Sequence, residues 1–148
     1  MKKIIATLAV IFSLTTSATF ASGGSSVNES VLKSFKKEFS GASNVSWVKL
    51  TDELYRFGFN YKGKDVQAFF TETGTLIATG SEISEDNLPL VVSKTVDLKY
   101  AGYRKTEIIE YTMDDNTEYL ITLSKDGKSY VVKASNNGSL ELYKKMSK

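Results

Sequence analysis

The sequence contains no cysteine, no histidine and only one proline in 148 residues. Without cysteine there is no disulfide framework, thiol nucleophile, iron–sulfur cluster or zinc–thiolate site. Without histidine the commonest general base and transition-metal ligand is missing as well. Carboxylate, lysine, serine and tyrosine chemistry remain open, but the sequence shows no convincing serine–lysine dyad, carboxylate pair or phosphate-binding glycine loop. These absences favour a protein that is not an enzyme, and they indicate no cofactor and no metal site.

An export signal is predicted at the N-terminus. Lys2 and Lys3 precede an apolar run from Ile4 to Leu14, and Thr19-Phe20-Ala21 fits a signal-peptidase site. The run is about a dozen residues long, whereas a membrane-spanning helix needs roughly 20. We therefore expect residues 1–21 to be removed near Ala21, leaving a protein without membrane attachment in the periplasm or outside the cell.

The positive charge of the chain belongs to this signal. The full sequence has 19 basic and 17 acidic residues, and loss of the two signal lysines leaves equal numbers. Basic and acidic residues alternate in the remainder, as in Lys36-Lys37-Glu38. Because nucleic-acid binding depends on clustered lysine and arginine, we expect no nucleic-acid partner.

The remaining pattern predicts one helix followed by four strands, twice over. A Gly/Ser-rich lead-in over residues 22–27 precedes a helix of about 12 residues that ends at Gly41, and a second helix is expected over 87–100. Strands are expected around 44–50, 53–61, 64–71 and 75–80, and again around 105–113, 117–124, 128–135 and 139–144. The predicted fold class is α+β. It consists of two tandem α-β-β-β-β repeats, 28–83 and 84–148, packed as one unit, each an antiparallel four-stranded meander covered by one helix.

Self-alignment supports the repeat. An offset of 64 takes Tyr55 to Tyr119 and Trp47 to Tyr111. The helices align at an offset of 61, which predicts about three extra residues in the second helix-to-strand connection. An anchor in the core or at the sheet edge is the favoured interpretation of Trp47, and a hot spot of a binding site is the alternative.

Particular residues suggest a family resemblance. They are Phe35 and Phe39, Gly41-Ala42, Val45-Ser46-Trp47, Tyr55, Ala68-Phe69-Phe70 with Gly74, Leu88-Pro89 with Val92, and Tyr100-Ala101-Gly102-Tyr103. This pattern resembles the PepSY-like, β-lactamase-inhibitor-protein-like domains exported by Bacteroidetes-type bacteria. The resemblance implies a tandem helix-plus-four-strand fold with a concave binding surface, and PepSY-type domains are thought to bind or restrain peptidases. One segment departs from the family, because residues 70–75 lack the tryptophan that its members often carry.

The sheet face that points away from the helices is a candidate partner-binding surface. Strand alternation places Ile108 on this face as well as seven candidate contact residues, Leu54, Arg56, Phe69, Ile77, Leu120, Val131 and Tyr143. So apolar a face, if exposed, marks an interaction site. In the alternative interpretation the two sheets pack on each other or are continuous, and the same residues lie inside the fold.

The sequence thus favours a secreted, non-enzymatic, inhibitor-like binding module that presents an apolar face to a periplasmic protein or peptide, such as a peptidase or hydrolase. The alternative is a carrier of a small hydrophobic ligand. The oligomeric state is not predicted.

Overall fold

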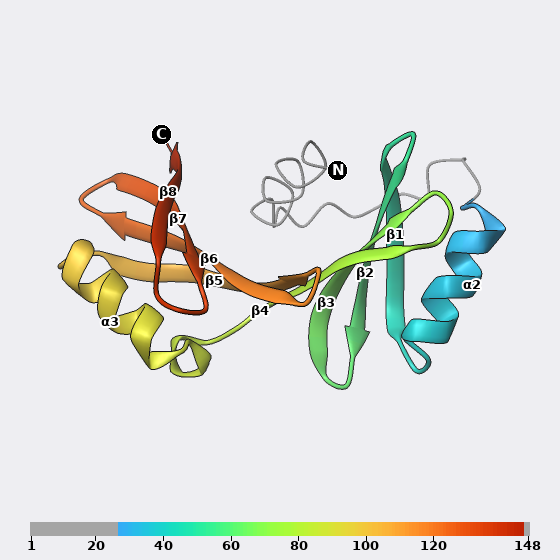
Figure 1. Cartoon of the computed structure of the whole chain (residues 1–148), viewed down its shortest axis with the longest axis horizontal. Coiled ribbons are helices and arrows are strands. Elements are labelled where there is room, and N and C mark those ends of the chain that lie inside the picture. The colour runs from blue at the N-terminus through green and yellow to red at the C-terminus, as the bar shows by residue number, and fades with distance from the viewer. Residues whose placement is uncertain (1–26, 147–148) are drawn as a thin grey trace. The chain divides into compact units, whose positions relative to one another are not determined.

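The computed structural model describes residues 27–146, so the expected signal peptide and most of the lead-in lie outside the described part. Residues 27–146 form two α-helices, a short 3-10 helix and eight strands, and the α-helices and strands follow one another in the order predicted from the sequence (Figure 1). Their bounds are α2 Glu29–Glu38, β1 Ser43–Thr51, β2 Leu54–Tyr61, β3 Lys64–Thr71, β4 Leu76–Glu82, η1 Glu85–Asn87, α3 Leu90–Lys99, β5 Arg104–Met113, β6 Asn116–Lys125, β7 Lys128–Ser135 and β8 Leu140–Met146. The strand order in the sheet follows the chain from β1 to β8. The expected α+β class with two α-β-β-β-β repeats is confirmed.

The chain divides into two compact units, with the division between Ser81 and Glu82. The sequence-based boundary after residue 83 stays a prediction. Between residues 27 and 146, neither α-helix has the length and apolar character needed to cross a membrane.

Local signals in the sequence explain where each helix begins and ends. The Asn28 side chain caps α2 by accepting a hydrogen bond from the Ser30 amide at 3.1 Å, and it donates another to the Glu72 carbonyl, also at 3.1 Å. Gly41 and Gly102 follow the two helices with φ of +92° and +79°. Glycine adopts this left-handed conformation readily, and so both helices end close to the predicted positions.

Each helix covers a core of different chemistry. In the first unit Phe35 stacks on Phe57, with ring centroids 4.5 Å apart, and meets Phe59 edge to face at 5.0 Å. In the second unit the equivalent space is filled mainly by aliphatic side chains, among them Val92, Val96 and Ile121. Aromatic pairs add a geometric preference to burial, so the first core is held by ring orientation as well as by apolar area.

The two repeats correspond at a different offset from the one predicted. Trp47 pairs with Phe57 across β1 and β2, and Ile108 pairs with Ile121 across β5 and β6. Trp47 is therefore equivalent to Ile108, not to Tyr111. The helices and first strands share the offset of 61, so the predicted three extra residues in the helix-to-strand connection are wrong. The three extra residues of the second repeat lie in the β5–β6 hairpin, because the offset is 61 before it and 64 after it.

A bulge at the start of each first strand accounts for this register. The pairing shifts between Ser43 and Ser46 in β1 and between Lys105 and Glu107 in β5. An extra residue in one strand reverses the side-chain alternation beyond it. For this reason Ile108 lies in the helix-covered core, and its expected place on the opposite face is wrong.

Candidate functional site

The structure buries four of the seven residues expected to form a partner-binding face. The exposed fraction is 5% for Leu54, 0% for Phe69, 2% for Leu120 and 1% for Val131. None of them belongs to either helix-covered core, so their assignment to the other face of the strands agrees with the structure. An exposed surface made of these four side chains is nevertheless not what the structure shows. Apolar side chains gain free energy when water is removed from them, and these four are buried accordingly.

The other three candidates are half-buried. Arg56 pairs with Phe69 across β2 and β3, and burial lowers the pKa of its guanidinium group. Ile77 and Tyr143 are the extra residues at the bulges of β4 and β8. The contact of these three residues with a partner stays a prediction.

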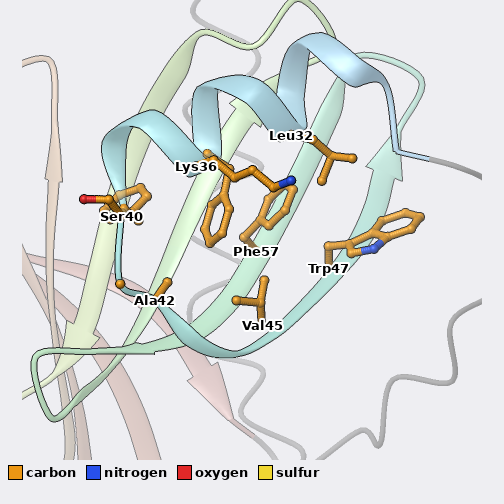
Figure 2. Close-up of a pocket in the computed structure, with 10 residues that line it drawn as sticks. Leu32, Lys36, Ser40, Ala42, Val45, Trp47 and Phe57 are labelled. Carbon is orange, nitrogen blue, oxygen red and sulfur yellow. The ribbon is translucent and has the colours of Figure 1, made fainter.

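An apolar groove lies elsewhere, between α2 and β1 of the first unit. Figure 2 shows Leu32 and Lys36 reaching from the helix, Val45 and Trp47 rising from the strand, and Phe57 between them. The groove has a volume of about 280 Å³. Its lining is completed by Phe35, Phe39, Ser40, Gly41 and Ala42.

Local backbone geometry creates this groove. Asn44 adopts φ +53° within the bulge of β1. Val45, the next residue, is 45% exposed and lines the groove, while Trp47 is partly buried against the first core. Ala42 lies in the connection between α2 and β1, and its side chain is only a methyl group. A small residue at the turn and a bulge after it thus leave a space beside the indole ring.

Lys36 supplies the charge of the groove. It is the one charged residue in the lining, which contains no carboxylate. Within residues 27–146, no ion pair holds the Lys36 ammonium group. The groove therefore combines an apolar floor with one solvated positive charge on its rim.

The equivalent place in the second unit is bridged by an ion-pair cluster. Lys105 Nζ lies 2.6 Å from Asp97 Oδ1 and 2.7 Å from Glu85 Oε1, and its side chain is only 5% exposed. Asp97 stands at the position of Lys36. Burial lowers the pKa of Lys105, but the hydrogen bonds that its ammonium group donates to the Asp97 and Glu85 carboxylates outweigh this effect, and the pKa is raised overall.

The small residue at the turn is also replaced in the second unit. Tyr103 stands where the first repeat has Ala42, and its ring lies 6.0 Å from Tyr100 and 5.6 Å from Tyr130. Thr106 stands in place of Val45. The two repeats thus share a backbone plan, while Ala42 of the groove has a larger counterpart in Tyr103 and Lys36 has an ion-paired counterpart in Asp97.

The sequence pattern does not predict this groove. It aligns Trp47 with Tyr111 and favours a place for Trp47 in the core or at the sheet edge. The offset of 61 that aligns the helices already pairs Lys36 with Asp97, and its extension to the first strands pairs Ala42 with Tyr103. That extension depends on the position of the β1 bulge, which strand periodicity does not indicate.

A second, polar hollow of about 360 Å³ lies where the β5–β6 and β7–β8 hairpins turn. Its residues are Asp115, Asn116, Thr117, Glu118, Ser135, Asn136 and Asn137. Glu118 accepts a hydrogen bond from the Tyr111 hydroxyl at 2.5 Å and lies 3.4 Å from Lys133 Nζ. Among the described residues no group of three side chains is suited to hold a metal ion.

Comparison with known proteins places the fold. No family model and no curated protein matches the sequence. A BLIP-like protein from Bacteroides fragilis is similar in structure, with a TM-score of 0.74, 18% identity, and coverage of 85% of this chain and 91% of that one. A presumed periplasmic protein from Bacteroides eggerthii gives a TM-score of 0.73 at 15% identity, covering 82% and 89%. A DUF2874 family protein from Bacteroides ovatus gives 0.71 at 21% identity, covering 83% and 89%.

These similarities concern the fold. They confirm the resemblance to BLIP-like proteins of Bacteroides that the sequence indicated, at the level of the tandem α-β-β-β-β architecture. The PepSY-like name stays a prediction.

Proposed function

We propose that this chain is a non-enzymatic binding module that is exported, loses its signal near Ala21, and binds a protein or peptide in the periplasm or outside the cell. The fold similarity to a BLIP-like protein and to a presumed periplasmic protein supports this proposal. Fold alone does not define function, so a binding role also needs a specific site on the surface of the protein.

The observation that carries the proposal is the groove between α2 and β1. Trp47 and Val45 line this groove, whereas the second repeat has the buried Ile108 and the polar Thr106 at the equivalent positions. Tryptophan beside a pocket is typical of the few residues that dominate a binding interface. An inhibitor-like role, with a peptidase or hydrolase as the target, fits a rigid surface of this kind.

The test is capture of a partner with the mature chain, from Ser22 onward, using the periplasmic and secreted fractions of its source. Val45→Asp places a charge in the groove at an exposed position. Leu98→Asp is the matched control, because Leu98 is 84% exposed on α3 and is not among the groove residues. We expect a protein that the wild type and Leu98→Asp retain and that Val45→Asp loses. Equal capture by all three would show that the groove is not the site.

A carrier of a small hydrophobic ligand is the second candidate, favoured by the apolar floor of the groove. Ligand pockets usually measure about 300–1,000 Å³. At about 280 Å³ the groove suits one side chain better than a drug-sized molecule. A ligand that copurifies with the mature chain in native mass spectrometry would reverse this preference.

A further inference from the structure

We propose that the groove and the strand beside it bind an extended acidic segment of a partner protein. The segment adds to the edge of β1 that has no neighbouring strand within residues 27–146, inserts one bulky apolar side chain beside Trp47, and places a carboxylate against Lys36. This inference rests on the proposed function and specifies the chemistry of the partner.

The backbone of β1 is suited to receive such a strand. β1 is the first strand in the sheet order, and within residues 27–146 its pairing partner is β2. An edge strand presents amide and carbonyl groups that an extended peptide can join. Pairing with β2 is regular from Ser46 to Lys49 and shifts on either side. The bulges therefore limit the added strand to a short segment.

The groove supplies side-chain selection. In an added strand, alternate residues point to the same face of the sheet, the face on which Trp47 lines the groove. Phe57, which is fully buried, forms the apolar floor, and Val45 lies exposed at one side. A phenylalanine or leucine of the segment fits this space better than a polar side chain, because it removes the exposed apolar surface from water.

Charge defines the remaining part of the segment. Lys36 is the groove's one charged residue and has no carboxylate partner among the described residues. Lys33 and Lys37 lie on the same helix and are exposed, but they are not among the groove residues. The positive charge of Lys36 favours a negatively charged partner and disfavours a basic one, which contributes more to specificity than to affinity.

The single tryptophan of the chain makes the test direct, because Trp47 lines the groove and its fluorescence changes when a ligand alters its surroundings. Short synthetic peptides of alternating threonine and valine that contain the sequence Glu-Thr-Phe, in which the glutamate and the phenylalanine point to the same face, are titrated into the mature protein, up to about 1 mM, and are called the Glu-Phe peptide. Companion peptides carry lysine in place of glutamate, serine in place of phenylalanine, or N-methyl groups along the backbone. Palmitate is the probe for a small hydrophobic ligand.

Two matched variants separate specific from general charge effects. Lys36→Glu reverses the charge on the rim, and Lys37→Glu makes the same change one residue away, outside the groove. We expect the Glu-Phe peptide to shift the Trp47 emission of the wild type and of Lys37→Glu. Lys36→Glu should bind it about fivefold more weakly, the effect of an exposed ion pair, and should bind the lysine peptide better. The serine and N-methylated peptides should bind less well to every form.

Several results would overturn the inference. They are no emission change with any peptide, equal effects of Lys36→Glu and Lys37→Glu, full binding of the N-methylated peptide, or a response to palmitate alone. If peptides fail while Val45→Asp still loses a captured protein, the binding-module proposal stands and the extended-segment mode is wrong. If the peptides bind as expected but no partner is captured, the proposal about peptide chemistry stands and the proposed cellular role is in doubt.

Discussion

Gly74 lies so close to Ser30 that a methyl group on Gly74 would come within 2.7 Å of the Ser30 carbonyl oxygen. The contact joins the turn between β3 and β4 to the first turn of α2. Gly138 repeats it in the second unit, where a methyl group would lie 2.9 Å from Cγ2 of Val91. In both repeats glycine lets the helix approach the last hairpin, with a φ of +87° at each position.

Gly74→Ala should therefore destabilise the first unit by about 3 kcal/mol. The left-handed conformation costs an alanine about 1–2 kcal/mol, and overpacking adds a similar amount. Gly63→Ala is the control, because its φ is +80° but a methyl group there meets no atom within 4 Å. It should cost only the conformational part. Urea unfolding followed by Trp47 fluorescence measures both, and equal costs would show that the helix moves away freely.

Lys105 should stabilise the second unit through its hydrogen bonds to the carboxylates of Asp97 and Glu85. We expect Lys105→Met to lower the free energy of unfolding by about 1–2 kcal/mol, since hydrogen bonds between charged groups are lost at a buried ammonium. A double-mutant cycle with Asp97→Asn should give a coupling energy of about 1 kcal/mol. The exposed pair of Lys49 and Asp52 is the comparison and should show no measurable coupling. Similar coupling energies for the Lys105–Asp97 and Lys49–Asp52 pairs would show that burial of Lys105 does not strengthen its ion pair.

Alkaline pH should weaken the fold through Tyr111. Burial raises the pKa of Tyr111, and the hydrogen bond to Glu118 raises it further. The unfolded chain releases this proton near the ordinary value of 10.0, before the folded chain does. Its contribution to stability is therefore complete below pH 10 and is lost as the pH rises above it. Urea titrations on either side of pH 10 should show a smaller fall for Tyr111→Phe, and an unchanged fall would assign the effect to other groups.

Phe69 and Leu120 should behave as interior residues. Phe69→Ala should cost about 3–5 kcal/mol and Leu120→Ala about 2–5 kcal/mol, the range for buried truncations. Leu98→Ala, at a side chain that is 84% exposed, should change stability by no more than about 0.5 kcal/mol. Denaturant unfolding separates these outcomes. If the first two variants keep wild-type stability, the residues act as an exposed face after all.

The strands and helices could be predicted because their signals are local. In the sequence, apolar and other residues alternate from Tyr55 to Phe59, which indicates the side of β2 that meets the helix, and the structure places both residues in the first core. The pairs Asp126-Gly127 and Asn137-Gly138 are typical of hairpin turns, and the structure has turns at both places. Each signal depends on residues a few positions apart, and tertiary packing did not override it.

The groove and the repeat register could not be predicted because they depend on bulges. One extra residue near Val45 changes which side chains of β1 face the helix, and hydrophobic periodicity alone does not locate it. The burial of Phe69 and Leu120 was left open for a related reason. Alternation assigns a side chain to a face but does not say whether that face meets water.

The strands at the two ends of the sheet order, β1 and β8, also affect solubility. Both carry bulges, at either end of β1 and at Tyr143 in β8. In β8 the neighbouring Lys144 and Lys145 are exposed. Irregular, lysine-bearing edges resist pairing with the edges of other copies, which is the first step of fibril growth. The bulges and lysines can thus prevent edge-to-edge pairing between copies of this chain, even where an edge is long enough to pair with a short segment of another protein.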